Sequence, residues 1–327
     1  MYSIKELQKI IEEEISVRSD HLKSRFPANL YLPVVYSLGM GGKRLRPVLL
    51  LLSYNLYRDD VKTAIPAALA IEVFHNFTLL HDDIMDKAEV RRNQLTVHKK
   101  FNENGAILSG DAMAFLAYQF LLECKSEKLP ETIKLFTDTA IEVCEGQQFD
   151  MDFENRTDVS ESDYMEMIRL KTAVLLACSL KAGALLANAS DEAADQLYHF
   201  GINLGLAFQL QDDFLDTFGS QETFGKRIGG DILSNKKTIL LIKALENASG
   251  NTKLELLEWL GKTEYKQEEK IEAITEIYNQ MNIRAIVNEK IETYFQNAMK
   301  LYTDLPLNEK KKKVLLSLSN NMLKRIK

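Results

Sequence analysis

The same cluster of three aspartates occurs twice in this chain, each time after a long apolar stretch. The first copy reads Asp-Asp-Ile-Met-Asp, within the stretch from Phe74 to Arg92, and the second reads Asp-Asp-Phe-Leu-Asp, within the stretch from Phe208 to Asp216. The six aspartates are Asp82, Asp83, Asp86, Asp212, Asp213 and Asp216. If each stretch is helical, the first and last aspartates of a cluster lie one turn apart on the same face. The chain must therefore fold so that two acidic helix faces are tolerated.

Two carboxylates on one helix face repel each other and destabilise the helix unless a cation offsets the repulsion. Hard divalent cations take oxygen ligands, and Mg²⁺ combines one or two carboxylates with substrate phosphates. The six aspartates are therefore candidate metal ligands, and together they would hold several Mg²⁺ ions, with Mn²⁺ as an alternative metal, around one polyphosphate. A solvated helix end is the structural alternative for a single cluster. Two clusters that both follow sequence expected to be buried favour the metal site.

The composition describes an ordinary soluble globular protein, with 327 residues, of which 46% are hydrophobic and 27% charged. The net charge of −6 argues against nucleic acid as the main partner. No signal-peptide core follows Met1 and no run approaches about 18 apolar residues, which predicts a cytoplasmic protein without a transmembrane segment. The three cysteines, Cys124, Cys144 and Cys178, are expected to be buried, reduced thiols.

Few of the 15 glycines and 6 prolines interrupt the long periodic segments, and no convincing alternating strand is present. The sequence therefore predicts an all-α fold, with residues 1–327 as one domain. Pro27 and Pro33 are expected to break the chain after the first helix. Helices are expected at residues 3–23, 63–85, 105–122, 130–148, 160–187, 191–216, 254–260, 267–301 and 310–326.

Basic residues are notable at two places in the sequence, a glycine-rich turn and an apolar segment. In the turn from Gly39 to Pro47 the glycines let the backbone approach a ligand closely, and Lys43 and Arg46, three residues apart at a helix start, point the same way. Two such cations suit a diphosphate, and a solvated basic turn is the structural alternative. Lys171 lies in a segment that is apolar nearly all round, so it is expected to be buried and to need an anion.

Taken in order over residues 35–245, these motifs resemble the polyprenyl synthetase family, the trans-isoprenyl diphosphate synthases. The matching features are the Gly41-Gly42-Lys43 turn with Arg46-Pro47, both aspartate clusters, Arg91-Arg92, Gly146-Gln147, Lys171-Thr172, Phe208-Gln209 and Lys226. The resemblance implies an isoprenoid-synthase-type helical bundle around a central cavity, usually as a homodimer. It also implies that the two aspartate motifs face each other across the cavity mouth.

The activity that the resemblance implies is condensation of isopentenyl diphosphate with an allylic prenyl diphosphate. Metal ions and fixed cations would stabilise the departing diphosphate, and a dry cavity would protect the allylic cation. A class I terpene cyclase is the enzymatic alternative, but it is not expected to have the second aspartate cluster or a second diphosphate site. A non-catalytic subunit of a heteromeric synthase is the other alternative, and it would be expected to have lost aspartates or the arginine pair.

The resemblance assigns a role to each matching residue. Asp82, Asp86 and Asp212 would coordinate the Mg²⁺ ions that hold the allylic diphosphate, with Asp83, Asp213 and Asp216 as near or outer ligands. Arg91, Lys171 and Lys226 would contact the same diphosphate. Lys43, Arg46, His75 and Arg92 would hold the diphosphate of isopentenyl diphosphate, although a core histidine bonded to backbone is the alternative for His75. Gln209 would lie beside the allylic group, Thr172 near the reacting carbons, and Lys236 would close over the site.

Two segments depart from the family pattern. Where the family usually reads Arg-Arg-Gly-x-Pro-Thr, this chain has Asn93 and Leu95 in place of glycine and proline, which leaves the conformation of this loop open. Family members also commonly have glycine at the position of Asn235. Neither departure removes an expected ligand.

Product length is expected to depend on the helix that carries Asp82. Phe77 lies five residues before Asp82, about 7 Å along a helix, with the small Thr78 beside it and Phe74 nearly one turn deeper. In this family an aromatic residue at the position of Phe77 resembles short-chain enzymes that make geranylgeranyl diphosphate, C20. Farnesyl diphosphate, C15, or a longer product is the alternative, and Phe77 could instead pack in the core.

Overall fold

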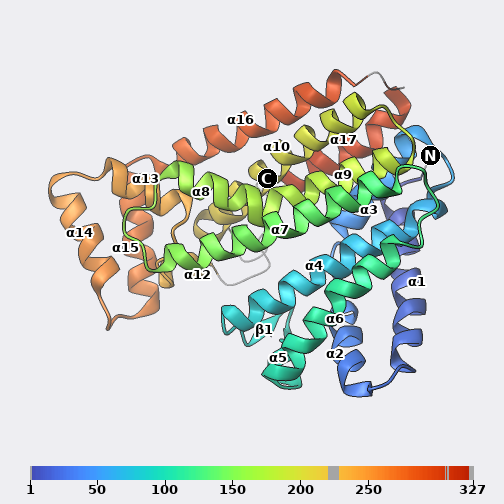
Figure 1. The fold of residues 1–327 in the computed structure, drawn as a ribbon. Coiled ribbons are helices and arrows are strands. Elements are labelled where there is room, and N and C mark those ends of the chain that lie inside the picture. The colour runs from blue at the N-terminus through green and yellow to red at the C-terminus, as the bar shows by residue number, and fades with distance from the viewer. Residues whose placement is uncertain (1, 220–227, 306, 308, 324–327) are drawn as a thin grey trace. The chain divides into compact units, whose positions relative to one another are not determined.

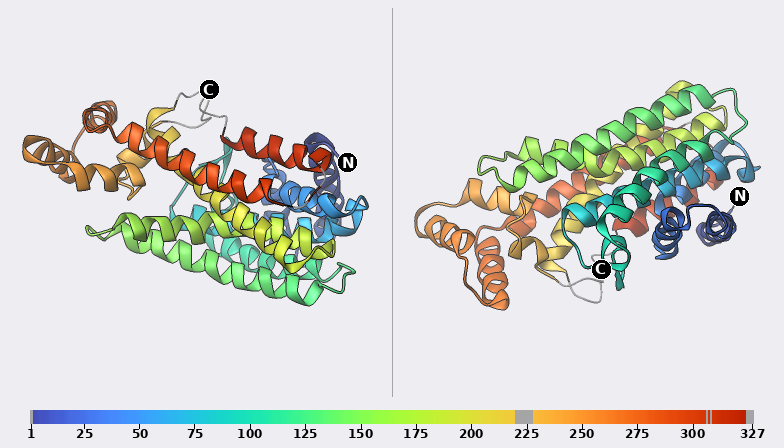
Figure 2. Two further views of the ribbon diagram at one scale, coloured as in Figure 1. Left: turned by 90° about the horizontal axis from the view of Figure 1, so that it is seen from above. Right: turned by 60° about the horizontal axis from the view of Figure 1, so that its bottom comes forward.

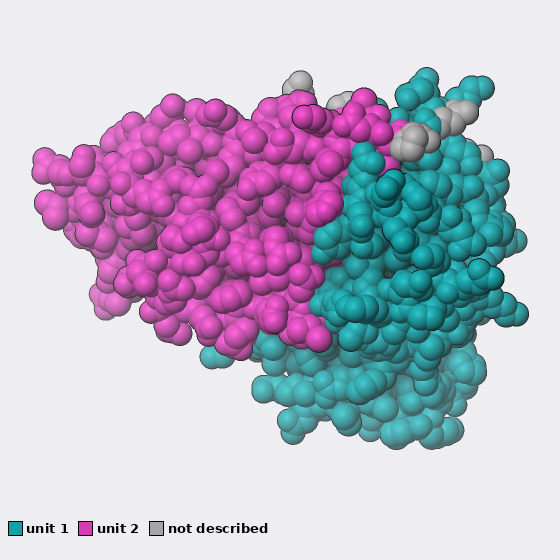
Figure 3. Space-filling view, turned by 45° about the horizontal axis from the view of Figure 1, so that its top comes forward, with its two compact units in different colours: residues 1–139, 178–198, 306–316 teal, residues 140–177, 199–305, 317–327 magenta. Residues whose placement is uncertain are grey.

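The computed structural model describes residues 2–219, 228–305, 307 and 309–323. These residues are almost entirely helical, which confirms the predicted all-α fold (Figure 1). The strands in the described part of the chain are one pair of two residues each. By its internal contacts the chain divides into two compact units, which Figure 3 colours separately. That the chain forms one domain stays a prediction.

Unit 1 comprises Met1–Thr139, Cys178–Tyr198 and Pro306–Leu316. The elements that lie wholly within it are α1 (Ile4–Lys23), α2 (Ala28–Gly39), α3 (Leu45–Tyr57), the 3₁₀ turn η1 (Val61–Ala64), α4 (Ile65–Met85), strands β1 (Val90–Arg91) and β2 (Gln94–Leu95), α5 (Val97–Lys100) and α6 (Glu103–Leu121). Four helices contribute residues to both units, namely α7 (Leu129–Glu154), α9 (Val174–Leu186), α10 (Asp191–Phe218) and α17 (Glu309–Leu323).

Unit 2 comprises Ala140–Ala177, His199–Leu305 and Ser317–Lys327. The elements within it are α8 (Glu161–Ile168), the π-helix η2 (Arg169–Ala173), α12 (Gly230–Leu233), α13 (Ile239–Asn247), α14 (Gly250–Gly261), α15 (Gln267–Gln280) and α16 (Ile283–Thr303). Helices α14 and α15 contact each other and form one end of this unit, where α15 also contacts α12, α13 and α16 (Figures 1 and 2).

The core of unit 1 is built around α3 and α4. Residues 47–56 of α3 are all buried, as expected for a helix that is apolar nearly all round. Helix α4 packs against α3 and α6 and also contacts α1 and α2. Near the aspartate cluster α4 approaches α6 closely, because a Cβ atom at Gly110 would lie 2.3 Å from Nε2 of His81. This tight packing fixes the end of α4 that carries the first cluster.

The core of unit 2 is built around the π-helix η2. A Cβ atom at Gly205 of α10 would lie 2.6 Å from Cα of Ala173, and one at Gly146 of α7 would lie 2.3 Å from the backbone nitrogen of Lys171. The two glycines therefore let α7 and α10 pack directly against η2. The apolar core continues through buried side chains such as Tyr164 and Phe214.

Three helix predictions are wrong in detail. Pro33 was expected to break the chain, but it lies inside α2 and is buried. A proline removes only one backbone donor, so the other hydrogen bonds of the helix remain. The segment predicted as one helix at residues 267–301 is split into α15 and α16, because Asn282 adopts a left-handed conformation with φ of 56°. Helix α7 continues past residue 148 to Glu154, which places Asp150 on a helix.

The segment after the first aspartate cluster forms a hairpin instead of the predicted loop. Val90 pairs with Leu95 and Arg91 with Gln94, which leaves Arg92 and Asn93 as a two-residue turn. Both turn residues have positive φ, 52° and 60°, as a type I′ hairpin turn requires. Asparagine tolerates this conformation better than most residues, so Asn93 can stand where the family has glycine.

Two further findings concern cysteines and membrane segments. Cys124 and Cys178 are buried free thiols as predicted, but Cys144 is exposed, as are Ile141, Glu145 and Gln148 at helical spacing on α7. Among the described residues one helical segment, Val61–Met85, is long and apolar enough to cross a membrane. Because 61% of its apolar window is buried inside the protein, it has the properties of a core helix.

Candidate active site

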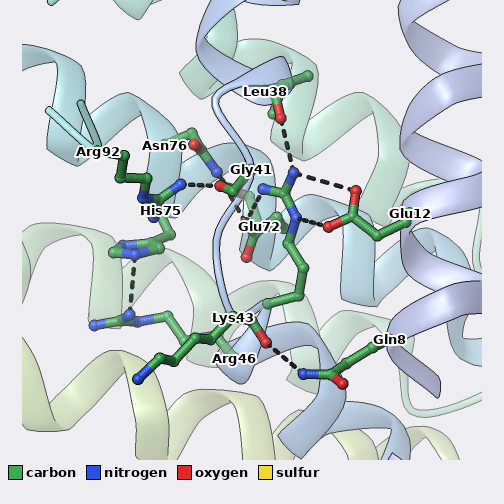
Figure 4. Close-up of polar contacts among 11 residues, drawn as sticks. Gln8, Glu12, Leu38, Gly41, Lys43, Arg46, Glu72, His75, Asn76 and Arg92 are labelled. Carbon is green, nitrogen blue, oxygen red and sulfur yellow. Dashed lines mark hydrogen bonds and ion pairs between the residues drawn. The ribbon is translucent and has the colours of Figure 1, made fainter. Parts of the chain in front are cut away.

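Arg44 organises the glycine-rich basic turn of unit 1 (Figure 4). It begins α3 in a left-handed conformation with φ of 48°, and its side chain is only 2% exposed. Its guanidinium donates to Glu72 Oε1 at 2.7 Å, to Glu12 Oε1 at 2.7 Å and to the carbonyl of Leu38 at 2.8 Å. The turn is therefore tied to α1, α2 and α4 at once. Arg44 was not predicted from the sequence, because the direction of its side chain depends on the unusual backbone conformation.

Arg46 and His75 form the next contact of this turn. Nη1 of Arg46 lies 3.0 Å from Nε2 of His75, and since a guanidinium only donates, Nε2 accepts and the ring proton is on Nδ1. Burial, with the charge of Arg46, lowers the pKa of His75 well below its ordinary value. Burial also lowers the pKa of Arg46 to about 10. The Nε atom of Arg46 is buried without a hydrogen-bond partner among the described residues, so it is a donor available to a ligand.

Arg92 reaches the same turn from the hairpin. Its Nη1 donates to the carbonyl of Gly41. A Cβ atom at Gly42, where φ is 134°, would lie 2.7 Å from Nη1 of Arg92, so glycine is needed for this approach. In Figure 4 the side chains of Lys43 and Arg46 extend to the same side of the turn. The predicted residues Lys43, Arg46, His75 and Arg92 are thus gathered around one glycine-rich turn.

Arg91 binds the first aspartate cluster. Its guanidinium donates to both carboxylate oxygens of Asp83 at 2.8 Å and lies 3.4 Å from Oδ2 of Asp82. Burial raises the pKa of Asp83, although the hydrogen bonds from Arg91 oppose this rise. Asp83 therefore ties the hairpin to α4. Asp86, at the end of α4, is exposed.

Four aromatic rings form a continuous column along α4 and onto α7. The ring of Phe77 lies 4.8 Å from that of His81 and 5.4 Å from that of Phe74, which in turn lies 5.2 Å from Phe136. Phe74 is buried and Phe77 is half-buried. The neighbouring Thr78 donates its hydroxyl to the backbone carbonyl of His75 at 2.8 Å. The sequence identified the two phenylalanines of α4, but Phe136 comes from a distant helix and carried no local signal.

In unit 2, two lysines converge on one carboxylate. Nζ of Lys171 lies 2.6 Å and Nζ of Lys236 lies 3.8 Å from Oδ2 of Asp150. Burial alone would raise the pKa of Asp150, but the charges of the two lysines lower it below its ordinary value. Asp150 is the anion that Lys171 was expected to need. The three side chains line a pocket together with Tyr164, Thr172 and Gln209.

A chain of hydrogen bonds links this pocket to the second aspartate cluster. The hydroxyl of Thr172 donates to Oε1 of Gln209 at 3.1 Å, and Nε2 of Gln209 donates to Oδ1 of Asp213 at 2.9 Å. The other oxygen of Asp213 accepts from the hydroxyl of Tyr164 at 2.6 Å. Burial raises the pKa of Asp213 to about 6, although the bond from Tyr164 opposes the rise. Since Thr172 and Lys171 lie on η2, the π-helix brings both to this pocket, as π-helices at functional sites often do.

The end of the second cluster is held by backbone contacts. Oδ2 of Asp216 accepts from the backbone nitrogen of Asp231 at 2.9 Å, and the carbonyl of Asp216 accepts from the nitrogen of Gly229. Burial, together with the charge of Asp213, raises the pKa of Asp231 to about 8. Asp231 is a further acidic residue that the sequence analysis did not select. Lys226 lies outside the described residues.

The donor sets of both clusters suit a hard cation. Within the described residues, no three or more His, Cys, Asp or Glu side chains are gathered as a ready-made metal site. Carboxylate oxygens are ligands that Mg²⁺ takes, and it combines one or two of them with substrate phosphates and water. The carboxylate oxygens present therefore fit Mg²⁺ as a partner of a bound polyphosphate.

Comparisons with known proteins point to one family. A sequence model described as polyprenyl synthetase matches residues 27–278, more than half of the chain. A geranylgeranyl diphosphate synthase of Methanosarcina mazei is 37% identical over 323 residues, covering 96% of this chain and 97% of the relative. A crystal structure of a geranylgeranyl pyrophosphate synthase is 45% identical, with a TM-score of 0.93 and 100% of both chains covered. The crystal structure of geranylgeranyl pyrophosphate synthase from Corynebacterium glutamicum, complexed with isoprenyl diphosphate and magnesium, has a TM-score of 0.89 at 25% identity, covering 99% of this chain and 100% of that one.

Proposed function

This chain belongs to the polyprenyl synthetase family, and on that premise we propose that it is a Mg²⁺-dependent trans-prenyltransferase. It condenses isopentenyl diphosphate with an allylic prenyl diphosphate and makes geranylgeranyl diphosphate, the product named for its relatives. The observation that carries the proposal is the presence of two separate sets of cations, each beside an aspartate cluster. Two cationic sets suit two diphosphate substrates, whereas a terpene cyclase binds one.

The set in unit 1 binds the diphosphate of isopentenyl diphosphate. Lys43, Arg46 and Arg92 surround one turn, and the Nε of Arg46, which has no hydrogen-bond partner in the described part of the chain, is a donor for a phosphate oxygen. Arginine presents a planar fork of donors that matches phosphate oxygens. His75 keeps the guanidinium of Arg46 in place by accepting its hydrogen bond, and its lowered pKa keeps it a neutral acceptor.

The set in unit 2 binds the allylic diphosphate. Lys171, Lys226 and Lys236 supply its positive charges. When the substrate binds, the two ammonium groups now shared by Asp150 turn toward the phosphate oxygens. Thr172 and Gln209, already linked by a hydrogen bond, lie beside the allylic carbons and orient them.

Each aspartate cluster would hold magnesium through its carboxylates. Asp82, Asp86 and Asp212 are the proposed ligands, and Asp83, Asp213 and Asp216 hold their surroundings in place through the contacts described above. Bound Mg²⁺ supplies electrostatic stabilisation of the charge that develops on the leaving diphosphate. The complex of the Corynebacterium glutamicum relative with isoprenyl diphosphate and magnesium supports magnesium as the metal.

The reaction needs no protein nucleophile. The allylic C–O bond breaks and leaves the diphosphate with the bonding electron pair. The double bond of isopentenyl diphosphate then attacks the allylic cation and forms the new C–C bond. The proton lost in this step passes to the departed diphosphate. The role of the protein is to hold both diphosphates and to keep water from the cation.

Product length is set by the aromatic column of α4. The growing tail runs along α4 from the first aspartate cluster, so the half-buried ring of Phe77 ends its path for a C20 product, with Phe74 behind it. Phe77→Ala should therefore lengthen the product. Phe26→Ala, which removes a ring that is 88% exposed, should leave it unchanged. An unchanged product in Phe77→Ala would remove this ring from the explanation.

A homodimer in the cytoplasm is the proposed working form. Leu108, Phe115 and Leu122 are 60%, 71% and 61% exposed, and their spacing of seven residues along α6 and its C-cap makes one apolar stripe. Exposed apolar stripes of this kind mark interaction surfaces. Phe115→Glu should give a monomer in light scattering, and an unchanged mass would place the interface elsewhere.

Product analysis tests the proposed function. Radiolabelled isopentenyl diphosphate is supplied with dimethylallyl, geranyl or farnesyl diphosphate in turn, with and without Mg²⁺, and the products are separated by chain length. Geranylgeranyl diphosphate should form only with metal. A cyclic hydrocarbon from an allylic diphosphate alone would indicate a cyclase, and no product from any pair would contradict the proposal.

A further inference from the structure

Asn235 is the residue of the basic loop that departs from the family pattern, and its backbone explains why glycine is common there. It lies between α12 and α13 in a left-handed conformation with φ of 52°. Glycine adopts this conformation without a steric penalty, and asparagine tolerates it better than most side chains. A glycine would serve the backbone equally well, so the asparagine side chain has to be explained by its contacts.

Both polar atoms of this side chain are bonded to the pair of helices α14 and α15. Nδ2 of Asn235 donates to the carbonyl of Leu260 at 3.0 Å, and Oδ1 accepts from Nζ of Lys270 at 2.8 Å. Lys270 is only 1% exposed, and its ammonium lies 4.4 Å from the ring centroid of Tyr265. The hydroxyl of Tyr265 in turn donates to the carbonyl of Leu233 at the end of α12 at 3.3 Å.

The burial of Lys270 determines which atom of the Asn235 amide faces it. A buried ammonium group is costly unless it is hydrogen-bonded, and here its partners in the described part of the chain are an amide oxygen and a ring face. Since an ammonium only donates, Oδ1 of Asn235 must face it, which leaves Nδ2 for Leu260. The amide orientation is therefore fixed from both sides, and the loop is fixed with it.

The loop fixed in this way carries Lys236. The backbone nitrogen of Lys236 donates to the carbonyl of Asp231, and its own carbonyl accepts from the nitrogen of Thr238. Its Nζ lies 3.8 Å from the carboxylate of Asp150 that also holds Lys171. A change in the backbone at Asn235 would therefore move the starting point of the Lys236 side chain relative to this carboxylate.

We propose that Lys270 and Asn235 are positioning residues for the reaction, which hold Lys236 in reach of the allylic diphosphate. The proposal rests on the proposed function, in which Lys236 contacts that diphosphate. It assigns a role to the α14–α15 pair, which carries none of the aspartate, arginine or lysine residues of the two substrate sites. It also explains why this chain tolerates asparagine at a turn where glycine is common.

Two substitutions remove the contact with little strain. Asn235→Gly keeps the left-handed backbone and deletes both side-chain bonds, and Lys270→Met keeps the length of the buried side chain without its charge. Each should lower kcat/KM for the allylic substrate about tenfold, the effect of losing one hydrogen bond to a charged group. The KM for isopentenyl diphosphate should stay unchanged. The matched control is Lys262→Met. The ammonium of Lys262 also lies over an aromatic ring of the α14–α15 pair, 4.1 Å from the ring centroid of Trp259, but Lys262 is exposed.

The decisive test repeats these substitutions in a Lys236→Ala background. If they act through Lys236, neither should lower kcat/KM further there, and the double variant Asn235→Gly/Lys270→Met should be no worse than either single variant. Hydrogen exchange should also speed up at the backbone amides of Lys236 and Thr238 in both single variants, and not in Lys262→Met. Wild-type kinetics in Asn235→Gly and Lys270→Met, or equal losses with and without Lys236, would overturn the positioning role.

The outcomes separate this proposal from the proposed function. If the wild-type protein makes prenyl diphosphates and Lys236→Ala is impaired, the proposed function stands whatever the other variants do, and they decide the role of Lys270 alone. If the wild-type protein makes no prenyl diphosphate with any primer, the proposed function is wrong and the positioning role falls with it.

Discussion

The cations of unit 1 and those of unit 2 are held in different ways. In unit 1 each arginine has its own protein partner: Arg44 the two glutamates, Arg46 the ring of His75, Arg91 the carboxylate of Asp83, and Arg92 the carbonyl of Gly41. In unit 2 two lysines share the single carboxylate of Asp150. The first set is a fixed frame, whereas the second is a pair of point charges gathered at one anion.

This difference matches the fate of the two diphosphates in the proposed reaction. Isopentenyl diphosphate keeps its diphosphate, so a rigid frame of planar guanidinium groups can bind the same group throughout. The allylic diphosphate leaves with additional negative charge, and flexible lysines can follow it from Asp150. Substitutions that affect one set of cations and leave the other intact test this difference.

The largest effect is expected from the aspartates, because both units need them. Asp82→Ala in unit 1 and Asp212→Ala in unit 2 should each lower kcat about a thousandfold or more, since each removes a carboxylate that holds the metal against the developing charge. Steady-state kinetics with and without EDTA measure the loss. Turnover that survives EDTA in either variant would mean that the aspartates of that cluster do not bind a catalytic metal.

A second large effect is expected on stability in unit 1. Arg44→Met leaves the carboxylate of Glu72, 3% exposed, buried without its cation, which should cost about 3 kcal/mol or more of unfolding free energy. Glu12→Gln removes a partner that is 47% exposed, so its cost should be below about 1 kcal/mol. Urea unfolding of both variants measures the difference.

The control for this pair is the double variant Arg44→Met/Glu72→Gln, which removes the isolated charge as well. It should recover much of the stability lost in Arg44→Met. Equal losses of unfolding free energy in Arg44→Met and Glu12→Gln would show that the buried pair of Arg44 and Glu72 does not stabilise the frame of unit 1.

The same contacts show how far sequence alone reaches. The repeated aspartates, the helical periodicity and the lone lysine in an apolar segment predicted the all-α fold and a cation that needs an anion. Lys171 has this anion, but it is half-buried, with 23% of its side chain exposed, and not fully buried as expected. The sequence did not indicate that the anion is Asp150, because α7 was expected to end before it and because the partners lie 21 positions apart. Arg44 was missed for a related reason: its left-handed backbone, which turns it away from Lys43 and Arg46, depends on contacts with three other helices.

A moderate effect should divide the two diphosphate sites. Arg46→Ala should raise the KM for isopentenyl diphosphate about tenfold or more, because it removes a charge-assisted contact made equally before and after ionisation. Lys171→Ala should instead lower kcat with the allylic substrate, because its contact strengthens as charge develops on the leaving diphosphate. Initial rates with each substrate varied in turn separate the two effects. An effect of Arg46→Ala confined to the allylic substrate would reverse the assignment of the two sets.

The smallest effect should appear as the pH dependence of stability that His75 gives to the arginine frame. His75 has a pKa well below its ordinary value, because it is buried and faces Arg46, with Arg92, Arg91 and Arg44 nearby. Above about pH 6.5 neither the folded nor the unfolded state protonates this ring, so it contributes no pH dependence there. As pH falls below 6.5 the unfolded state takes up the proton first, so stability falls by up to about 1.4 kcal/mol per pH unit until the folded pKa is reached. His75→Gln keeps an acceptor for Arg46 but does not titrate, so its urea midpoint should fall less between pH 7.5 and 5.5 than that of the wild-type protein. The same fall in both proteins would mean that His75 accepts a proton in the folded state, and its hydrogen bond with Arg46 would then not be a fixed part of the arginine frame.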